Sequence, residues 1–371
     1  MPSLIDAFTD FVASTGVKIV HGPDDILNDA VKNTYLIKRA VSGKDISRHV
    51  KAGQKLSDRI QLTDSGTATF YHPNDDLNIV ASQNLKTVEV PWRFLADHYT
   101  YTEQEVELNS GSGQTYYKNL LKSKRQACMT SMYNRKEEAL FARPSATQME
   151  GDDGKLPYSL QCFISPQSSG LPYTGEDGTA WTVVETLNPS TNSRWRNQRE
   201  TYDSGNKNDA DVGLVAAFDE MWMKVKFESP RAPSEYFEDD RFQKMMICTS
   251  RDGRRIYLRL TRDANDRLMG ADLGYHQTML TYAGLPMEYI AELDTAAVRS
   301  DGTAMVAGSP WYYWVNFEYL YPIFHSQQYM KEQKPKSHPR QPFSYVVWKS
   351  TYYNWFCRSR RRQGLVYPAG G

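Results

Sequence analysis

Two neighbouring groups of side chains near the C-terminus could do chemistry: a run of aromatic residues and, directly after it, Arg358, Arg360 and Arg361. Aromatic faces stack on bases and sugars, and guanidinium groups bind phosphates and carboxylates, so together they could form a ligand platform. The same rings could instead fill a core or an interface. The aromatic residues are Trp311, Tyr312, Tyr313, Trp314, Phe317, Tyr319, Tyr321, Phe324, Phe343, Tyr345, Trp348, Tyr352, Tyr353, Trp355 and Phe356.

The sequence lacks the usual short motifs of catalysis and metal binding. It contains no GxxxxGK(S/T) phosphate loop, no HExxH, no EF-hand loop and no GxSxG. Its seven histidines are not spaced as metal ligands, and its cysteines form no CxxC pair. Facing carboxylates could still arise in the fold, because spacing along the chain does not reveal them. We therefore expect no catalytic residue, no metal, no cofactor and no enzyme, with four reduced structural thiols at Cys128, Cys162, Cys248 and Cys357.

Composition limits the size of the core and the kind of partner. A chain of 371 residues exceeds the roughly 250 to 300 residues that one core supports, so at least two packed units are expected. Forty-four basic and forty-four acidic residues cancel, so any contact with nucleic acid should be local or shared among many copies. The N-terminus has no basic and apolar leader, and no window reaches about 18 uninterrupted apolar residues. We expect synthesis in the cytoplasm and no membrane partner.

The elements that must position these groups begin with two short helices. Apolar residues recur at helical spacing at Leu4, Phe8 and Phe11, and a second such run extends from Asp24 to Ala40. From about 57 to 108 the period changes to two, which predicts a long antiparallel hairpin without a core of its own. Val88, Val90, Trp92 and Phe94 line one face of it, and Pro91 indicates an edge or a bulge.

The longest predicted helix follows, from Tyr116 to Phe141, and Pro144 ends it. Further elements are a helix at 210–225, a buried strand at 244–249, a helix at 252–268, strands between 279 and 293, and strands in the last sixty residues. This order predicts an α+β fold with a mixed central domain. The long helix carries a basic face that includes Lys122, Arg125, Arg135 and Lys136.

The order of these elements resembles the major capsid protein of tailed bacteriophages, the Hong Kong 97-type fold. Three stretches also resemble a subgroup of phage major capsid proteins: NPSTNSRWRNQ at 188–198, PKSHPRQPF at 335–343 and YNWFCRSRRRQG at 353–364. The resemblance implies an N-terminal arm at 1–50, an extended loop at 51–108 and a peripheral domain at 109–205 with a spine helix at 114–143. It also implies an axial domain at 206–308 and C-terminal strands at 309–371 that return to the peripheral domain.

The function that this resemblance implies is self-assembly into the icosahedral head of a double-stranded DNA phage. The partners would be further copies in hexamers and pentamers, a scaffolding protein, a portal, cement proteins and the packaged DNA, all in the virion. Leu4, Phe8, Phe11, Val88, Val90, Trp92 and Phe94 are then expected at interfaces between subunits. Lys122, Arg125, Arg135, Lys136, Arg358, Arg360 and Arg361 are expected to face DNA or a scaffold. The alternatives are an aromatic-rich enzyme acting on carbohydrate or nucleic acid, or a tail or cement protein.

Overall fold

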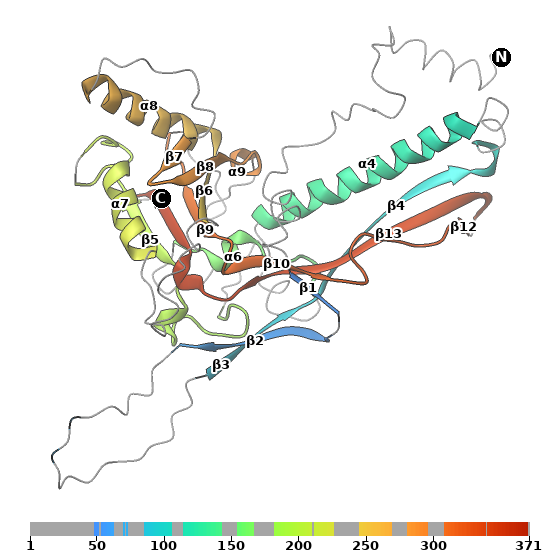
Figure 1. The fold of residues 1–371 in the computed structure, drawn as a ribbon, viewed down its shortest axis with the longest axis horizontal. Helices are drawn as coiled ribbons and strands as arrows, with labels where there is room; N and C mark the ends of the chain where they lie inside the picture. The colour runs from blue at the N-terminus through green and yellow to red at the C-terminus, as the bar shows by residue number, and fades with distance from the viewer. Residues whose placement is uncertain are drawn as a thin grey trace. The chain divides into compact units, whose positions relative to one another are not determined.

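Figure 1 shows the fold of the chain in a computed structural model. The chain forms two compact units. The first unit comprises Met1–Lys32, Leu95–Arg135 and Gln328–Thr351, and the second comprises Asn33–Phe94, Lys136–Gln327 and Tyr352–Gly371. The structure describes residues 48–51, 53–62, 70, 72, 85–105, 114–142, 154–166, 182–209, 211–225, 245–268, 280–295, 308–338 and 340–369. The two predicted N-terminal helices, with Leu4, Phe8 and Phe11, lie outside these residues.

The first unit contains most of the long helix α4 (Gln114–Phe141), which confirms the predicted helix. It also contains most of the strands β4 (Arg93–Thr102) and β13 (Gln341–Cys357), together with β11 (Lys331–Glu332) and β12 (Lys336–His338). Strands β11 and β12 pair antiparallel with β13, and β4 pairs with β13 as well. Ring contacts join β4 to β13, at 4.7 Å between His98 and Trp348 and 5.4 Å between Tyr101 and Tyr345.

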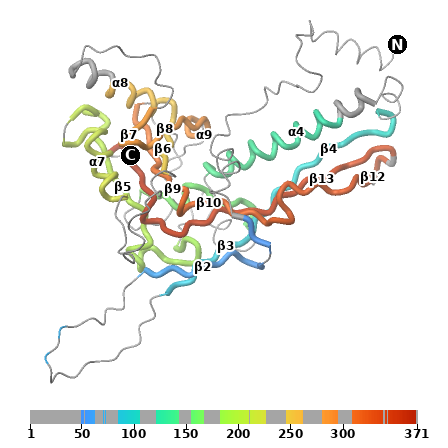
Figure 2. Tube along the Cα trace, in the orientation of Figure 1, coloured from blue at the N-terminus to red at the C-terminus, as the bar shows by residue number. Residues whose placement is uncertain are grey.

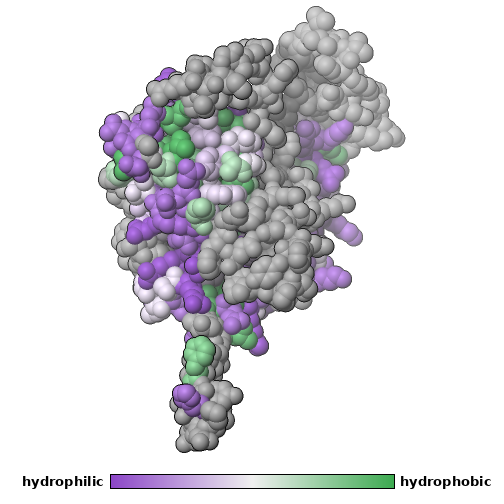
Figure 3. Space-filling view, turned by 60° about the vertical axis from the view of Figure 1, so that its left-hand side comes forward, coloured by the Kyte–Doolittle hydropathy of each residue, from purple (hydrophilic) through white to green (hydrophobic). Residues whose placement is uncertain are grey.

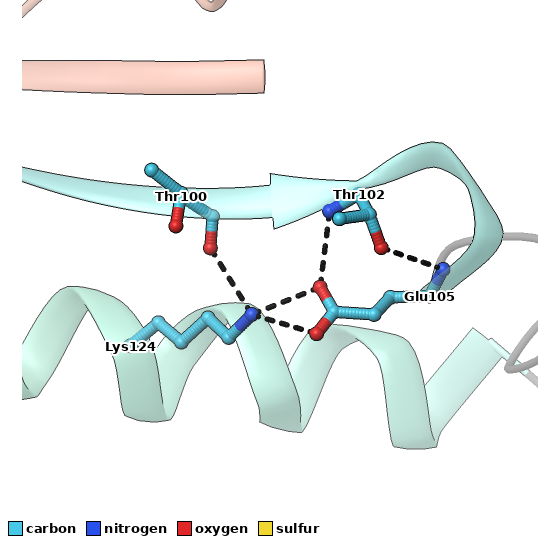
Figure 4. A network of polar contacts seen from close by, with 4 residues as sticks. All are labelled: Thr100, Thr102, Glu105 and Lys124. Carbon is cyan, nitrogen blue, oxygen red and sulfur yellow. Dashed lines mark hydrogen bonds and ion pairs between the residues drawn. The ribbon is translucent and has the colours of Figure 1, made fainter. Parts of the chain in front are cut away.

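Polar contacts fix the end of β4 against α4 within the first unit (Figure 4). The carboxylate of Glu105 accepts hydrogen bonds from the Thr102 backbone N–H, at 3.0 Å, and from Lys124 Nζ, at 2.9 Å. Lys124 also donates to the Thr100 carbonyl, and the Glu105 N–H donates to the Thr102 hydroxyl. Burial alone would raise the pKa of Glu105, but the bonds from Lys124 and Thr102 outweigh it and lower the pKa.

The second unit contains the base of the predicted hairpin, which the structure confirms. Strand β2 (Lys55–Gln61) pairs antiparallel with β3 (Leu85–Pro91), from Lys55 opposite Pro91 to Gln61 opposite Leu85. The strand pairing stops at Pro91, which has no N–H to donate, and the chain continues after Trp92 into β4. Alternation along the strands places Leu56, Val88 and Val90 on the buried face of the hairpin.

A mixed sheet forms the centre of the second unit, as the predicted strand–helix–strand order indicated. Among the described strands its order is β5 (Gln198–Tyr202), β14 (Gly364–Pro368), β9 (Tyr312–Asn316), β6 (Met245–Thr249), β8 (Leu285–Tyr289) and β7 (Leu280–Tyr282). Every residue of β6 is buried. The C-terminal strand β14, the last red segment of the trace in Figure 2, lies between β5 and β9. It is parallel to β5 and antiparallel to β9.

Two helices share an aromatic core on this sheet. Helix α7 (Leu214–Val225) and helix α8 (Arg251–Leu268) correspond to the predicted helices. The ring of Phe218 on α7 lies 5.7 Å from Tyr257 on α8 and 5.5 Å from Trp314 on β9. A β-carbon at Gly364 would come within 2.5 Å of the Met221 sulfur, so the close packing of α7 on β14 requires glycine there.

The remaining described elements of the second unit surround this centre. Strand β1 (Arg48–Val50) pairs parallel with β10 (Leu320–His325), and β10 pairs antiparallel with the end of β13. Short helical segments are α6 (Leu160–Phe163), η1 (Ser193–Trp195), α9 (Glu292–Thr295) and η4 (Arg360–Arg362). No described helix is both long and apolar enough to cross a membrane.

Candidate assembly surface and charged residues

The aromatic residues of the C-terminal third lie mainly inside the protein. Trp311, Trp314 and Trp355 are at most 1% exposed, so their faces are not available to stack on a base or sugar. Phe343, at 63%, and Trp348, at 41%, are the large aromatic side chains of this region that the structure shows exposed among its described residues. The interpretation of this segment as a ligand platform is therefore wrong for most of its rings, which form core.

The hairpin covers a tight turn of its own chain. Val88 and Val90 are fully buried and Trp92 is nearly so, and Trp92 donates its indole N–H to the Gly53 carbonyl at 2.9 Å. The Glu89 N–H points to the carbonyl of Glu185, at 3.4 Å. We expected Val88, Val90 and Trp92 to face a neighbouring subunit. That expectation is corrected, because residues of the same chain already bury these side chains. Alternation predicted a buried face, but it does not identify what covers that face.

Exposed apolar side chains of the second unit form the candidate assembly surface. Phe94, which was expected at an interface, is 67% exposed and meets Tyr352 edge-on at 4.6 Å. Leu85, at the end of the hairpin base, is 58% exposed, and Met223 on α7 is 72% exposed. Val212 and Val215 are also exposed. Each of these apolar side chains is a candidate for burial by another chain, because burying apolar area that water now contacts is favourable.

The basic residues of α4 divide between the surface and the interior. Lys122, Arg125 and Arg135 are exposed, and Arg125 Nε lies 2.8 Å from Glu332 Oε2 within the first unit. Lys136 is only 1% exposed and its ammonium lies 5.4 Å from the centre of the Tyr353 ring, which corrects the expectation that it faces DNA. Burial lowers the pKa of Lys136 to about 7.

The sequence contained a signal for this burial. Lys136 follows Met132 by four residues and Cys128 by eight, which places it on the apolar stripe of the helix rather than on the face of Arg135. Met132 and Cys128 are buried in the structure, as that stripe predicts.

The C-terminal arginines contact their own chain. Arg358 Nε lies 3.2 Å from the Asp58 carboxylate on β2, with both side chains partly exposed. Arg360 is fully buried and donates to the carbonyls of Phe163, at 2.9 Å, and Trp195, at 3.0 Å. Arg360 was expected to face DNA or a scaffold, and that expectation is corrected. Its guanidinium is instead the hydrogen-bond donor to two buried carbonyl groups. Arg361 is partly exposed.

A buried carboxylate, Glu185, lies where the hairpin meets the end of β13, and the sequence did not indicate it. Glu185 and Thr186 have φ values of 52° and 71°, in the left-handed region, in a turn closed by the bridge between Val184 and Leu187. The Glu185 carboxylate accepts the Cys357 N–H at 2.8 Å. Burial raises the pKa of Glu185, opposed by this hydrogen bond and by the charge of Arg360. Such strain is maintained only where the surrounding contacts hold it in place.

The thiols and the acidic groups give no sign of a reaction centre in the described part of the chain. The four cysteines are free and buried, as the sequence predicted, and burial raises the pKa of Cys162 to about 12. Nowhere among the described residues do three His, Cys, Asp or Glu side chains gather as metal ligands would.

Comparison with known proteins identifies the fold. No protein-family model matches the chain, and no curated protein matches it by sequence. The structure is similar to a chain of the cyanophage A-1(L) capsid, with a TM-score of 0.60 at 11% identity over 95% of this chain and 98% of that one. It is also similar to the capsid of a native GTA particle, with a TM-score of 0.52 at 12% identity over 96% and 98%. The chain therefore has the Hong Kong 97-type α+β fold of phage capsid proteins.

Proposed function

We propose that this protein is a major capsid protein that assembles into the icosahedral head of a tailed bacteriophage and encloses its double-stranded DNA. The observation that carries the proposal is the likeness of fold to the cyanophage A-1(L) capsid over 95% of this chain and 98% of that one. A likeness that covers nearly the whole of both chains favours the same kind of use.

The exposed apolar residues support assembly from many copies. Phe94, Leu85 and Met223 present apolar area that a symmetric lattice of the same chain would bury repeatedly. Leu4, Phe8 and Phe11 are proposed to add contacts from the arm. The division into arm, extended loop, peripheral domain, axial domain and returning strands remains part of this proposal. So do hexamers and pentamers, a scaffolding protein, a portal, cement proteins, residence in the virion and synthesis in the host cytoplasm.

Five of the expected basic residues remain candidates for contact with DNA or a scaffold. Lys122, Arg125, Arg135 and Arg358 keep exposed side chains and Arg361 a partly exposed one, unlike Lys136 and Arg360. These basic residues are few, and the net charge of the chain is zero. Both observations agree with DNA contacts that are divided among many copies of the chain.

The competing function is an enzyme that uses the aromatic segment to stack on carbohydrate or nucleic acid. The burial of Trp311, Trp314 and Trp355 opposes it, because a stacking platform must present its ring faces to the ligand. We therefore propose that the chain is not an enzyme.

The test is to shorten the hairpin beyond its base. Residues 63–84 are replaced by a short Gly-Ser linker, which leaves the paired strands β2 and β3 intact. The expected result is a soluble chain with the wild-type circular dichroism spectrum and no closed particles in negative-stain images. A control chain carries the same number of Gly-Ser residues added after Gly371, and it should still form particles. The proposal fails if the unmodified chain sediments as a monomer at every concentration, or if the shortened chain assembles normally.

A further inference from the structure

An open cleft beside α8 in the second unit is lined mainly by arginines. It has a volume of about 580 Å³, and its walls are Arg251, Arg254, Arg255, Leu258, Leu280 and Tyr289. Figure 3 brings the side of the molecule with α7 and α8 forward and shows hydrophilic surface beside small hydrophobic patches. Three guanidinium groups and one phenol in a cleft with apolar walls are typical of a site for an anion.

The guanidinium groups of two of these arginines have no carboxylate partner in the described part of the chain. Arg255 lies 3.1 Å from Asp252, one turn away, and its side chain is 60% exposed. Arg251 is exposed and Arg254 is half-buried, and the structure records no ion pair for either among the residues it describes. The guanidinium groups of Arg251 and Arg254 line the same cleft, so an anion bound there would be attracted by both.

The backbone at the start of α8 is already occupied. The Arg251 N–H donates to Asp294 Oδ1 at 2.8 Å, and the Gly253 N–H points to the Ser250 hydroxyl at 3.3 Å. Tyr289 donates its hydroxyl to the other oxygen of Asp294, at 2.7 Å. Binding in the cleft would therefore depend on the arginine side chains, not on the end of the helix.

The basic groups continue along the helix, which favours a polyanion over a single small anion. Arg259 lies two turns after Arg251 and lines a second cleft, of about 640 Å³, together with Lys207. At ~1.5 Å per residue, the step from Arg251 to Arg259 covers about 12 Å along the helix axis. Each strand of DNA presents one phosphate per ~3.4 Å of the duplex axis, so several would fall within this length. Arginine also binds phosphate through two parallel hydrogen bonds.

We propose that the arginine cleft, defined as Arg251, Arg254 and Arg255, binds backbone phosphates of double-stranded DNA without sequence preference. This inference deepens the proposed function, because it adds a DNA contact on α8 to those that the sequence had predicted on α4 and the C-terminal arginines. Carboxylates from a protein could also meet the guanidinium groups. The row of basic residues favours the regularly spaced charges of DNA.

The test measures binding of a fluorescein-labelled 24-base-pair duplex to the unassembled chain by anisotropy, at several NaCl concentrations between 50 and 200 mM. The cleft variant is Arg251→Gln with Arg254→Gln. The control variant, Arg59→Gln with Arg340→Gln, removes the same charge from exposed side chains elsewhere. The cleft variant should bind at least tenfold more weakly, and its slope of log K against log salt should fall by about 2, roughly one for each lost phosphate contact. The control variant should change binding less than twofold.

Three results would overturn the inference. The first is equal weakening in both variants, which would mean that net charge alone determines binding. The second is unchanged DNA binding in the cleft variant together with lost binding of a synthetic peptide of residues 232–242, which would assign the cleft to an acidic protein segment. The third is tighter binding of tripolyphosphate than of the duplex, which would assign it to a free phosphate compound.

The same samples separate this inference from the proposed function. If the cleft variant forms particles and binds DNA like the wild type, the DNA site in the cleft is contradicted and the capsid proposal stands. A wild-type chain that never forms particles, but whose DNA binding depends on the cleft, would remove the capsid proposal and leave the DNA site.

Discussion

Arg360 and Arg361 are adjacent in the sequence, but only Arg360 is held inside the second unit. Its guanidinium donates to the buried carbonyls of Phe163 and Trp195. Replacing Arg360 with alanine would leave both carbonyls without that donor and create a cavity. We expect Arg360→Ala to lower the free energy of unfolding by about 3 kcal/mol in urea titrations. Arg361→Ala, the control, should change it by less than about 0.5 kcal/mol. Equal effects would contradict the structural role of Arg360.

Lys136 offers a second test at the scale of one residue. Its folded pKa of about 7 lies below that of an exposed lysine, so between pH 7 and pH 10 the unfolded chain binds more protons than the folded one. The stability of the folded state therefore rises with pH across this window as the cost of burying the charge disappears. Lys136→Met should stabilise the unassembled chain by about 2 kcal/mol at pH 7, because it removes the buried charge.

The pH dependence of the Lys136→Met effect distinguishes the removal of a buried charge from improved packing. The advantage of Lys136→Met over the wild type in urea titrations should be smaller at pH 9.5 than at pH 7. An advantage of the same size at both values would show that methionine acts through packing alone. Lys122→Met, at an exposed site of the same helix, should give no such trend.

At the scale of elements, Lys124 and Glu105 join the end of β4 to α4. Hydrogen bonds from Lys124 and Thr102 outweigh burial and lower the pKa of Glu105, so the stability they supply is present above the pKa of the unfolded group. It is lost as the pH falls through the folded pKa. We expect Lys124→Met to destabilise the chain by about 0.5 kcal/mol at pH 7, since both groups are partly exposed, and less at pH 3. A loss that grows on acidification would contradict the contact.

The sequence predicted the kind and order of most elements, but not what covers each face. Strict alternation identified the hairpin, and the apolar spacing of Phe218 and Met221 identified α7, because local patterns determine these features. It did not show that the turn at Glu185 would bond to Glu89 on β3, since that contact joins segments far apart in the chain. Long-range contacts of this kind leave no periodic trace in a single sequence.

The candidate sites were harder to predict for the same reason. The alternating pattern of its strand predicted Phe94 at an interface, and Phe94 is exposed. Arg360 was expected at a surface because it belongs to a run of basic residues, and arginine is usually exposed. Its burial depends on two carbonyls supplied by α6 and η1, which no local pattern connects with it. The arginine cleft was missed because Tyr289 and Leu280 reach it from strands distant in sequence.

At the scale of the whole molecule, assembly should depend on exposed apolar area that folding of one chain leaves in water. Phe94→Ser should keep the unfolding midpoint within a few degrees, because the side chain is 67% exposed. It should reduce the yield of particles in sedimentation by at least tenfold. Phe343→Ser, at a phenylalanine of similar exposure in the first unit, is the matched control. Equal loss in both would mean that general surface hydrophobicity, not the Phe94 position, drives assembly.

The turn at Glu185 also gives the second unit a mechanical property. Its backbone carbonyl receives the N–H of Glu89 on β3, and its carboxylate receives the N–H of Cys357 at the end of β13. One residue in a strained conformation thus joins two segments at once. A neighbour that pulls on the hairpin would transmit its load through Glu185 directly to the end of β13, without passing through the central sheet.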